Sequence, residues 1–171
     1  GNLIHRNVRP KNIFLSQDGD FKLGLFGNTD IFGEAPGVLP QNGIQEYIAP
    51  EVYRGANYDN PVDLFSLGLV LYQALNRNRL PFLPLSGSCS TIDREQALKK
   101  RLEGKAVMDP PIDASPEFAG IIMKMCAYSP EQRYRTAAEL LGELNHVMPY
   151  VKRTNPDTIN VGKLGTRPVS M

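Results

Sequence analysis

The most informative stretch of this chain is IHRNVRPKN, residues 4–12. It carries three cations, Arg6, Arg9 and Lys11, while residues 1–17 contain no acidic side chain. Asparagine at two positions and proline at a third make a regular helix or strand unfavourable here. We therefore expect an irregular basic loop.

Downstream of this loop the sequence predicts a β-hairpin and then a long connection. Residues 12–15 and 21–23 are apolar and β-prone, and Gln-Asp-Gly-Asp at 17–20 supplies a turn signal between them. Residues 27–50 hold four Gly and three Pro, and neither a period of 2 nor one of 3.6 runs through them. A loop of this length within a compact domain is usually functional or disordered.

Helices are expected in the remainder of the folded part. Asn60 and Pro61 have the character of an N-cap and a first helical position. The residues from Leu64 to Leu75 are apolar on nearly all sides, which indicates a buried helix. Three further helices are expected at 91–104, from 115 to about 128, and from 136 to about 147.

Composition restricts the class of protein. The 171 residues are 42% hydrophobic and 22% charged, which is typical of one globular domain. A net charge of +1 favours neither nucleic acid nor a membrane surface, and the longest apolar run is far too short to span a bilayer. Two cysteines, Cys89 and Cys126, make no disulfide scaffold and have no metal-ligand spacing. We therefore expect a reducing, cytoplasmic location.

Five motifs in a fixed order give the chain a family resemblance. Residues 4–12, KLGLFG at 22–27 and YIAPE at 47–51 resemble the catalytic loop, the metal-binding turn and the end of the activation segment of protein kinases. DLFSLG at 63–68 resembles the start of that family's buried central helix, and SPEQRY at 129–134 resembles its Pro-x-x-Arg motif near the last helix. The residues of these motifs are most similar to those of the serine/threonine protein kinases of bacteria.

The resemblance implies a fold and a domain division. It implies the mainly α C-terminal lobe of the α+β protein kinase fold, with a short β-hairpin at the cleft, over residues 1–149. Residues 150–171 are polar and are expected to form a flexible tail. The family's glycine-rich loop, strand Lys and helix Glu precede the catalytic loop, so we expect the N-terminal lobe to be missing from this chain. The initial Gly1 fits a fragment of a longer product.

The residues that would carry phosphotransfer depart from the family pattern. Asn7 stands where the family has the Asp that accepts the substrate proton, and Leu25 stands where an Asp holds Mg²⁺. Arg9 replaces the catalytic-loop Lys, and Ile44 replaces a Thr that helps to hold it. Asn12 keeps the other metal-ligand position, but one neutral amide oxygen is a poor magnesium site.

The residues that would hold the fold match the family. By resemblance His5 and Phe26 belong to an internal hydrophobic spine, and Asp63 ties the catalytic-loop backbone to the central helix. Glu51 and Arg133 match a buried ion pair that fixes the end of the activation segment. Phe14 falls at the floor of the adenine pocket, and Arg6 would meet a phosphorylated activation loop. The ordinary alternative for His5 is a hydrogen-bonded structural histidine.

The residues that would stabilise the fold match the family, whereas those that would carry phosphotransfer do not. This combination predicts a pseudokinase, that is, a non-catalytic interaction or regulatory module. The alternative is a serine/threonine kinase with residual ATP-dependent phosphotransfer in a full-length parent, and a third interpretation is a decayed gene product. No cofactor or metal is expected; ATP and Mg²⁺ enter by family resemblance alone. The expected partners are proteins or the missing N-terminal lobe, with no nucleic acid and no membrane contact.

Charge segregation adds one further hypothesis. Residues 25–51 carry acids but no Lys or Arg. We predict that Asp30, Glu34 or Glu46 lies near Arg6 or Arg9 and substitutes for a phosphate. One alternative is that these charges are solvated and that each pair contributes about 0–1 kcal/mol to stability. Another is that the basic loop binds an anion.

Overall fold

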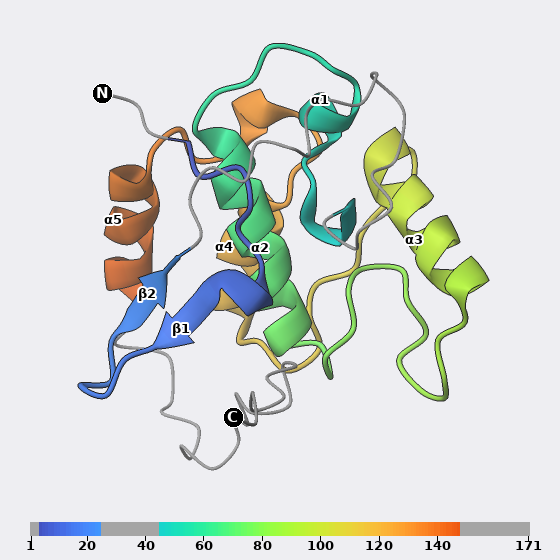
Figure 1. The fold of residues 1–171 in the computed structure, drawn as a ribbon, viewed down its shortest axis with the longest axis horizontal. Coiled ribbons are helices and arrows are strands. Elements are labelled where there is room, and N and C mark those ends of the chain that lie inside the picture. Colours follow the sequence, from blue (N-terminus) through green and yellow to red (C-terminus); the bar gives the residue numbers. More distant parts are fainter. Residues whose placement is uncertain (1–3, 25–44, 148–171) are drawn as a thin grey trace, which may run out of the picture.

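Helix α2 (Pro61–Ala74) forms the centre of the molecule, and the other long helices lie around it (Figure 1). The computed structural model describes residues 4–24 and 45–147. Within these ranges the remaining elements are the 3₁₀ turns Pro10–Asn12, Gln45–Tyr47 and Pro130–Gln132, strands β1 (Ile13–Leu15) and β2 (Phe21–Leu23), and helices α1 (Pro50–Tyr53), α3 (Thr91–Glu103), α4 (Pro116–Met125) and α5 (Ala137–Val147). The predicted mainly helical fold with a small hairpin is confirmed.

Apolar side chains on all sides of α2 explain its central place. Phe65 and Leu69 are almost fully buried in a core cluster that also contains Ile122 of α4. A second cluster joins α2 to α4 and α5 through Leu64, Met125 and Leu140. Burying one aliphatic side chain contributes about 1.5–3 kcal/mol, so these clusters supply much of the stability of the helical layer.

A glycine lets α2 and α4 pack closely. A Cβ atom at Gly68 would lie 2.7 Å from the Cβ of Met125 and 2.8 Å from the Sγ of Cys126. Distances below 3.0 Å cannot be accommodated without a shift of the backbone or of these side chains. Glycine at this position therefore fixes how near the two helices lie.

The hairpin has the predicted antiparallel pairing but an unpredicted exposure. Ile13 pairs with Leu23 and Leu15 with Phe21, and Gly19 takes the turn at φ +86°. Phe14 is 50% exposed and Phe21 is 67% exposed. The two strands therefore form a small projecting ribbon (Figure 1) rather than part of the core.

Several predicted boundaries are corrected by the structure. Asn12 belongs to a 3₁₀ turn and not to the first strand. The helix expected to reach residue 128 ends at Met125, and the short helix α1 was not predicted. Most of the predicted loop at 27–50 and the predicted tail at 150–171, with its boundary after 149, lie outside the described residues.

Asn60 does not cap α2 with its side chain. Its backbone is already helical, at φ −44° and ψ −35°, so its side chain makes no cap hydrogen bond. Instead the amides of Val62 and Asp63 donate to the carbonyls of Asp59 and Asn60, at 3.1 Å each. The helix begins through a tight turn, and the Asp63 carboxylate is left available for another partner.

Candidate functional site

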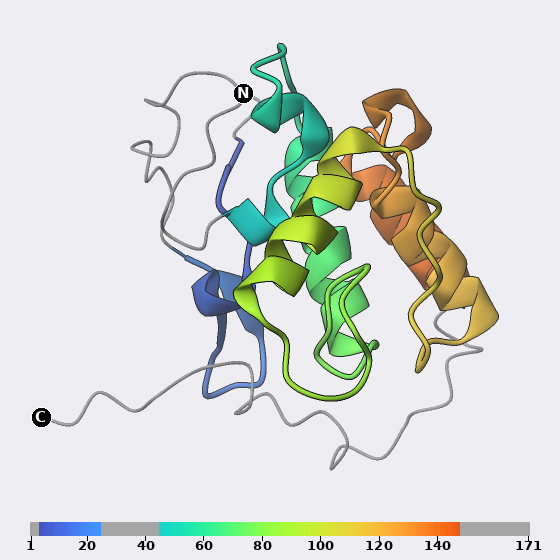
Figure 2. The ribbon, with the colours of Figure 1, turned by 90° about the vertical axis from the view of Figure 1, so that its right-hand side faces the viewer.

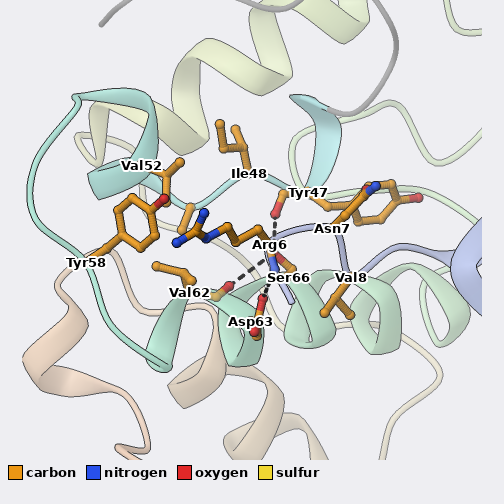
Figure 3. A pocket seen from close by; sticks show the side chains of 11 residues that line it. Arg6, Asn7, Val8, Tyr47, Ile48, Val52, Tyr58, Val62, Asp63 and Ser66 are labelled. Carbon is orange, nitrogen blue, oxygen red and sulfur yellow. Dashed lines mark hydrogen bonds between the residues drawn. The ribbon is translucent and has the colours of Figure 1, made fainter. Parts of the chain in front are cut away.

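The carboxylate of Asp63 holds the basic loop against α2 (Figure 3). Its Oδ2 accepts from the backbone N–H of His5 at 2.6 Å, and its Oδ1 accepts from that of Arg6 at 2.8 Å. Arg6 has φ +65°, a left-handed conformation that a side chain other than glycine rarely adopts. Two charge-assisted hydrogen bonds, each worth about 1.5–3 kcal/mol, stabilise this bend.

His5 connects the loop to the end of the hairpin. The side chain is 3% exposed, its Nδ1 accepts from the N–H of Asn7 at 3.2 Å, and its Nε2 lies 2.9 Å from the carbonyl oxygen of Gly24. Because Nδ1 accepts, the ring proton is assigned to Nε2, which donates to Gly24. These contacts are those of a hydrogen-bonded structural histidine.

Two buried amides occupy the centre of the loop. Asn12 is fully buried, and its Nδ2 donates to the carbonyl of Asn7 at 2.8 Å. Among the described residues, the Oδ1 atoms of Asn7 and Asn12 and the Nε of Arg9 are buried without a hydrogen-bond partner. The loop therefore contains unsatisfied amide oxygens, which are neutral acceptors and not bases.

The cavity beside this loop is small. It measures about 20 Å³, which is room for a water molecule, and it is lined by Asn7, Tyr47, Tyr58 and Ser66 among others (Figure 3). The Arg6 guanidinium extends away from Asn7 and lies 5.8 Å from the centre of the Tyr58 ring. A nucleotide does not fit in this space.

The segment around Tyr47 is tied to α2 and α3. The Tyr47 hydroxyl donates to Oε1 of Gln73 at 2.5 Å, and Ser66 Oγ lies 2.7 Å from the Tyr47 carbonyl. Burial, with the nearby charge of Glu46, raises the pKa of Tyr47 to about 12. The Tyr47 hydroxyl therefore stays protonated at neutral pH and is not placed to act as a base.

Glu46 has a different cationic partner from the one predicted. It pairs with Arg94 of α3 at 3.1 Å, and both side chains are partly exposed. The other two acids of the phosphate-mimic hypothesis, Asp30 and Glu34, lie outside the described residues. The structure therefore assigns Glu46 to a surface pair that anchors α3.

Glu51 and Arg133 are brought together from positions far apart in the sequence. Arg133 donates from both terminal nitrogens, with Nη1–Oε1 at 2.6 Å and Nη2–Oε2 at 2.9 Å. Exposure is 0% for the arginine side chain and 4% for that of the glutamate. The guanidinium also lies 4.6 Å from the centre of the Phe65 ring.

Of the remaining predicted residues, Phe14 is the one that lies among the described residues. Phe14 lies on the projecting hairpin against Gly24, where a Cβ would be 2.9 Å from its ring. Leu25, Phe26 and Ile44 lie outside the described residues. Phe14 is not among the residues that line the three cavities found around described residues.

Arg101 is a buried residue that the sequence interpretation missed. It is 8% exposed, and its guanidinium donates to the carbonyls of Pro81 at 2.9 Å and Glu46 at 3.3 Å. Its place four residues after Ala97 and three after Leu98, on the apolar stripe of an amphipathic helix, was the available signal.

The described side chains do not form a magnesium site. Residues 4–24 and 45–147 contain no group of three or more His, Cys, Asp or Glu that could hold a metal ion. Mg²⁺ requires several oxygen donors in near-octahedral geometry, and Asn12 offers one amide oxygen. The described residues also contain no helix long and apolar enough to cross a membrane.

Comparison with known proteins establishes the class. A basic loop fastened to a central helix by Asp63, and a buried ion pair behind it, lie within a region that matches the protein kinase domain over residues 1–144. The chain belongs to the protein kinase family.

Its relatives include kinases of bacteria and mammals. It is 30% identical over 152 residues to the serine/threonine-protein kinase PknB of Mycolicibacterium smegmatis. The matched part covers 85% of this chain and 23% of the relative. It is 33% identical over 144 residues to the tyrosine-protein kinase MasK of Myxococcus xanthus, covering 80% of this chain and 20% of the relative. It is 32% identical over 131 residues to the cGMP-dependent protein kinase 2 of Mus musculus, and the matched part covers 77% of this chain and 16% of the relative. The chain thus spans less than a quarter of these relatives.

Proposed function

We propose that this chain is a protein-kinase-family module that has lost phosphotransfer and acts by binding protein partners, a pseudokinase. The observation that carries the proposal is Asn7, which occupies the family's proton-accepting position in a loop that is otherwise firmly held. Asp63 and His5 organise this loop through backbone contacts. The loop is therefore held in place, but the side chain at position 7 is an amide and not a carboxylate.

The chemistry of an amide explains the expected loss. An asparagine side chain has no accessible pKa at which it can accept a proton, although its oxygen can accept a hydrogen bond. General-base catalysis contributes about 10²–10⁴-fold to a rate, equivalent to roughly 3–5 kcal/mol of activation free energy. Loss of the base alone would therefore slow the chemical step by several orders of magnitude.

The second substitution acts on the metal. Leu25 stands at the position that supplies a magnesium ligand in the family, and its side chain has no donor atom. Asn12 remains, with its Oδ1 buried and unpartnered among the described residues. Because one neutral oxygen does not hold Mg²⁺ against phosphates, Asn7 and Leu25 weaken two separate parts of the reaction.

The proposed partners are proteins, which include an N-terminal lobe carried on the same or another chain. The hairpin residues Phe14, Leu15 and Phe21 are each at least half exposed, which leaves apolar surface beside the basic loop. The balanced charge of +1 does not favour nucleic acid. A cytoplasmic location is part of this proposal.

A second candidate function is residual serine/threonine phosphotransfer in a longer parent protein. It is favoured by the similarity to relatives such as the serine/threonine-protein kinase PknB, at 30% identity. Such an activity would need other groups to replace both the proton acceptor and the metal ligand. The two candidates therefore differ in one measurable property, Mg²⁺-dependent transfer from ATP.

The test uses the full-length gene product and its Asn7→Asp, Leu25→Asp double variant. Each is incubated with Mg²⁺, ATP labelled on the γ-phosphate and a generic protein acceptor, and incorporation is counted. We expect no incorporation by the natural protein. Incorporation that exceeds a metal-free control would overturn the proposal and establish the second candidate. Activity only in the double variant would show that these two side chains are sufficient to prevent transfer.

A further inference from the structure

A cavity larger than the one at the basic loop lies among α2, α3 and α4. It measures about 240 Å³, and residues of the connection between α3 and α4 line it. Figure 2 shows the course of this connection along α3 and α4. Most of its wall is apolar, and the main contributors are Phe65, Leu69, Phe82, Met108, Met123 and Cys126. Val107, which is 90% exposed, belongs to its mouth. For comparison, an apolar cavity of about 150 Å³ in a protein binds benzene.

The charges around this cavity are all positive. Arg101 and Lys100 line it, and no Asp or Glu does. Arg101 is buried, and the partners found for its guanidinium are carbonyl oxygens of Pro81 and Glu46. Within residues 4–24 and 45–147 no carboxylate lies within ion-pair distance of it. The charge of Glu46 acts on Arg101 from beyond that distance. A buried cation with no counter-charge in contact with it is stabilised when an anion approaches.

The protonation of Arg101 and the backbone of Phe82 are consistent with a ligand site. Burial lowers the pKa of Arg101 to about 10, so the guanidinium remains charged at neutral pH. Phe82 has φ +69°, a strained conformation for an aromatic residue, and Lys100 Nζ lies 5.8 Å from the centre of its ring. Backbone strain of this kind clusters at binding sites.

We propose that this cavity binds a small monocarboxylic acid with an apolar chain or ring of about eight carbons, whose carboxylate faces Arg101 and Lys100. The apolar wall receives the hydrocarbon, and the carboxylate supplies a counter-charge in contact with Arg101, which no described carboxylate provides within ion-pair distance. This site is separate from the basic loop, so the proposal is independent of whether the chain transfers phosphate.

The methionine methyl groups provide a direct test. The chain contains five methionines; Met108 and Met123 line the cavity, whereas Met125 is fully buried in the second core cluster. In the 171-residue chain labelled with ¹³C at the methionine methyls, titration with sodium octanoate should shift the Met108 and Met123 resonances saturably and leave Met125 unmoved. Absence of a saturable shift at both, or an equal shift of Met125, would overturn the proposal.

Two comparisons test the role of charge. 1-Octanol has the same chain length without the carboxylate, and we expect it to bind at least about tenfold more weakly, because it brings no counter-charge into contact with Arg101. Equal or tighter binding of octanol would overturn the carboxylate assignment. Lys100→Gln should weaken octanoate binding about three- to fivefold. Lys99→Gln, on the same helix but outside the cavity lining, should leave it unchanged; equal affinities of the two variants would contradict the assigned role of Lys100.

Discussion

Arg133 donates two hydrogen bonds to the carboxylate of Glu51, from Nη1 to Oε1 at 2.6 Å and from Nη2 to Oε2 at 2.9 Å, although the two residues are 82 positions apart in the sequence. The same guanidinium donates to the carbonyls of Ala127 and Tyr128 and stacks near Phe65. One side chain therefore links α1, α2 and the segment before α5. Since α1 directly follows Tyr47, the pair also positions the connection that borders the basic loop.

Removing one partner of this pair should be strongly destabilising. We expect Arg133→Met to lower the free energy of unfolding by about 3–5 kcal/mol, because Glu51 would remain as an uncompensated buried charge. Urea denaturation followed by circular dichroism measures this change. Arg94→Met, which removes the surface pair with Glu46, is the matched control and should cost about 1 kcal/mol or less. Similar losses in the two variants would refute the distinction.

Asp63 should control the order of the basic loop. Asp63→Asn leaves one acceptor oxygen without full charge for the amides of His5 and Arg6, so we expect a loss of about 2 kcal/mol. Amide hydrogen exchange detected by mass spectrometry should accelerate most in peptides that cover residues 5–8. Asp59→Asn, at an exposed position next to the same helix, serves as the control and should change stability by less than about 0.5 kcal/mol. Unchanged exchange at residues 5–8 would show that Asp63 does not hold the loop.

Alkaline pH should destabilise the chain through Cys126. Burial raises the pKa of this thiol from 9.0 to about 12, so between these values the unfolded chain releases a proton that the folded chain retains. Stability is therefore fully present below pH 9 and falls as pH rises toward 12, at no more than about 1.4 kcal/mol per pH unit for one group.

Between pH 9 and 10 this thiol makes the larger contribution, because the two tyrosines whose pKa values burial raises to about 12, Tyr47 and Tyr72, begin from 10.0 and are at most half ionised in the unfolded chain there. Chemical denaturation at pH 8, 9 and 10 should show a decline in the natural chain. Cys126→Ala should be less stable at every pH because of the cavity it creates, but its decline between pH 9 and 10 should be reduced to the part that the tyrosines contribute. A decline of the same size in this variant would assign the effect to other groups.

Two glycine substitutions should have opposite effects. Gly104 ends α3 at φ +65°, and a Cβ there would lie 2.4 Å from the ring of Tyr128. We expect Gly104→Ala to lower stability by about 2 kcal/mol or more. Gly120 lies within α4 with nothing within 4 Å of its Cβ position, so Gly120→Ala should raise stability by about 0.5–1 kcal/mol. Thermal unfolding would test both, and a stabilised Gly104→Ala variant would contradict the packing described.

Local patterns predicted most of the elements. The apolar run from Leu64 to Leu75 indicated a buried helix, and the Asp-Gly turn signal indicated the hairpin. Both depend on short-range chemistry, namely burial on all helix faces and a turn at positive φ. Asn60 and Pro61 occupy the predicted N-cap and first-turn positions, but Asn60 makes no side-chain cap hydrogen bond, because such a cap needs an extended backbone and the chain is already helical there.

The candidate site was predictable only in part. The motif resemblance named Asn7, Asp63, Glu51 and Arg133 from residue identities. It did not reveal Arg101, or the pairing of Glu46 with Arg94, because both depend on where α3 lies against the segment before α1. Side-chain partners across such distances are set by packing and not by local propensity.

The sequence by itself determined which chemical groups the chain possesses: an amide at residue 7, a leucine at residue 25, and the helical pattern of a protein kinase family member. Only the tertiary structure decided where charges are buried and what faces them. Arg133 meets a carboxylate in the core, whereas Arg101 meets carbonyl oxygens beside an apolar cavity. The physical reason is that the cost of burying a charge depends on its three-dimensional surroundings, which the order of residues along the chain does not specify.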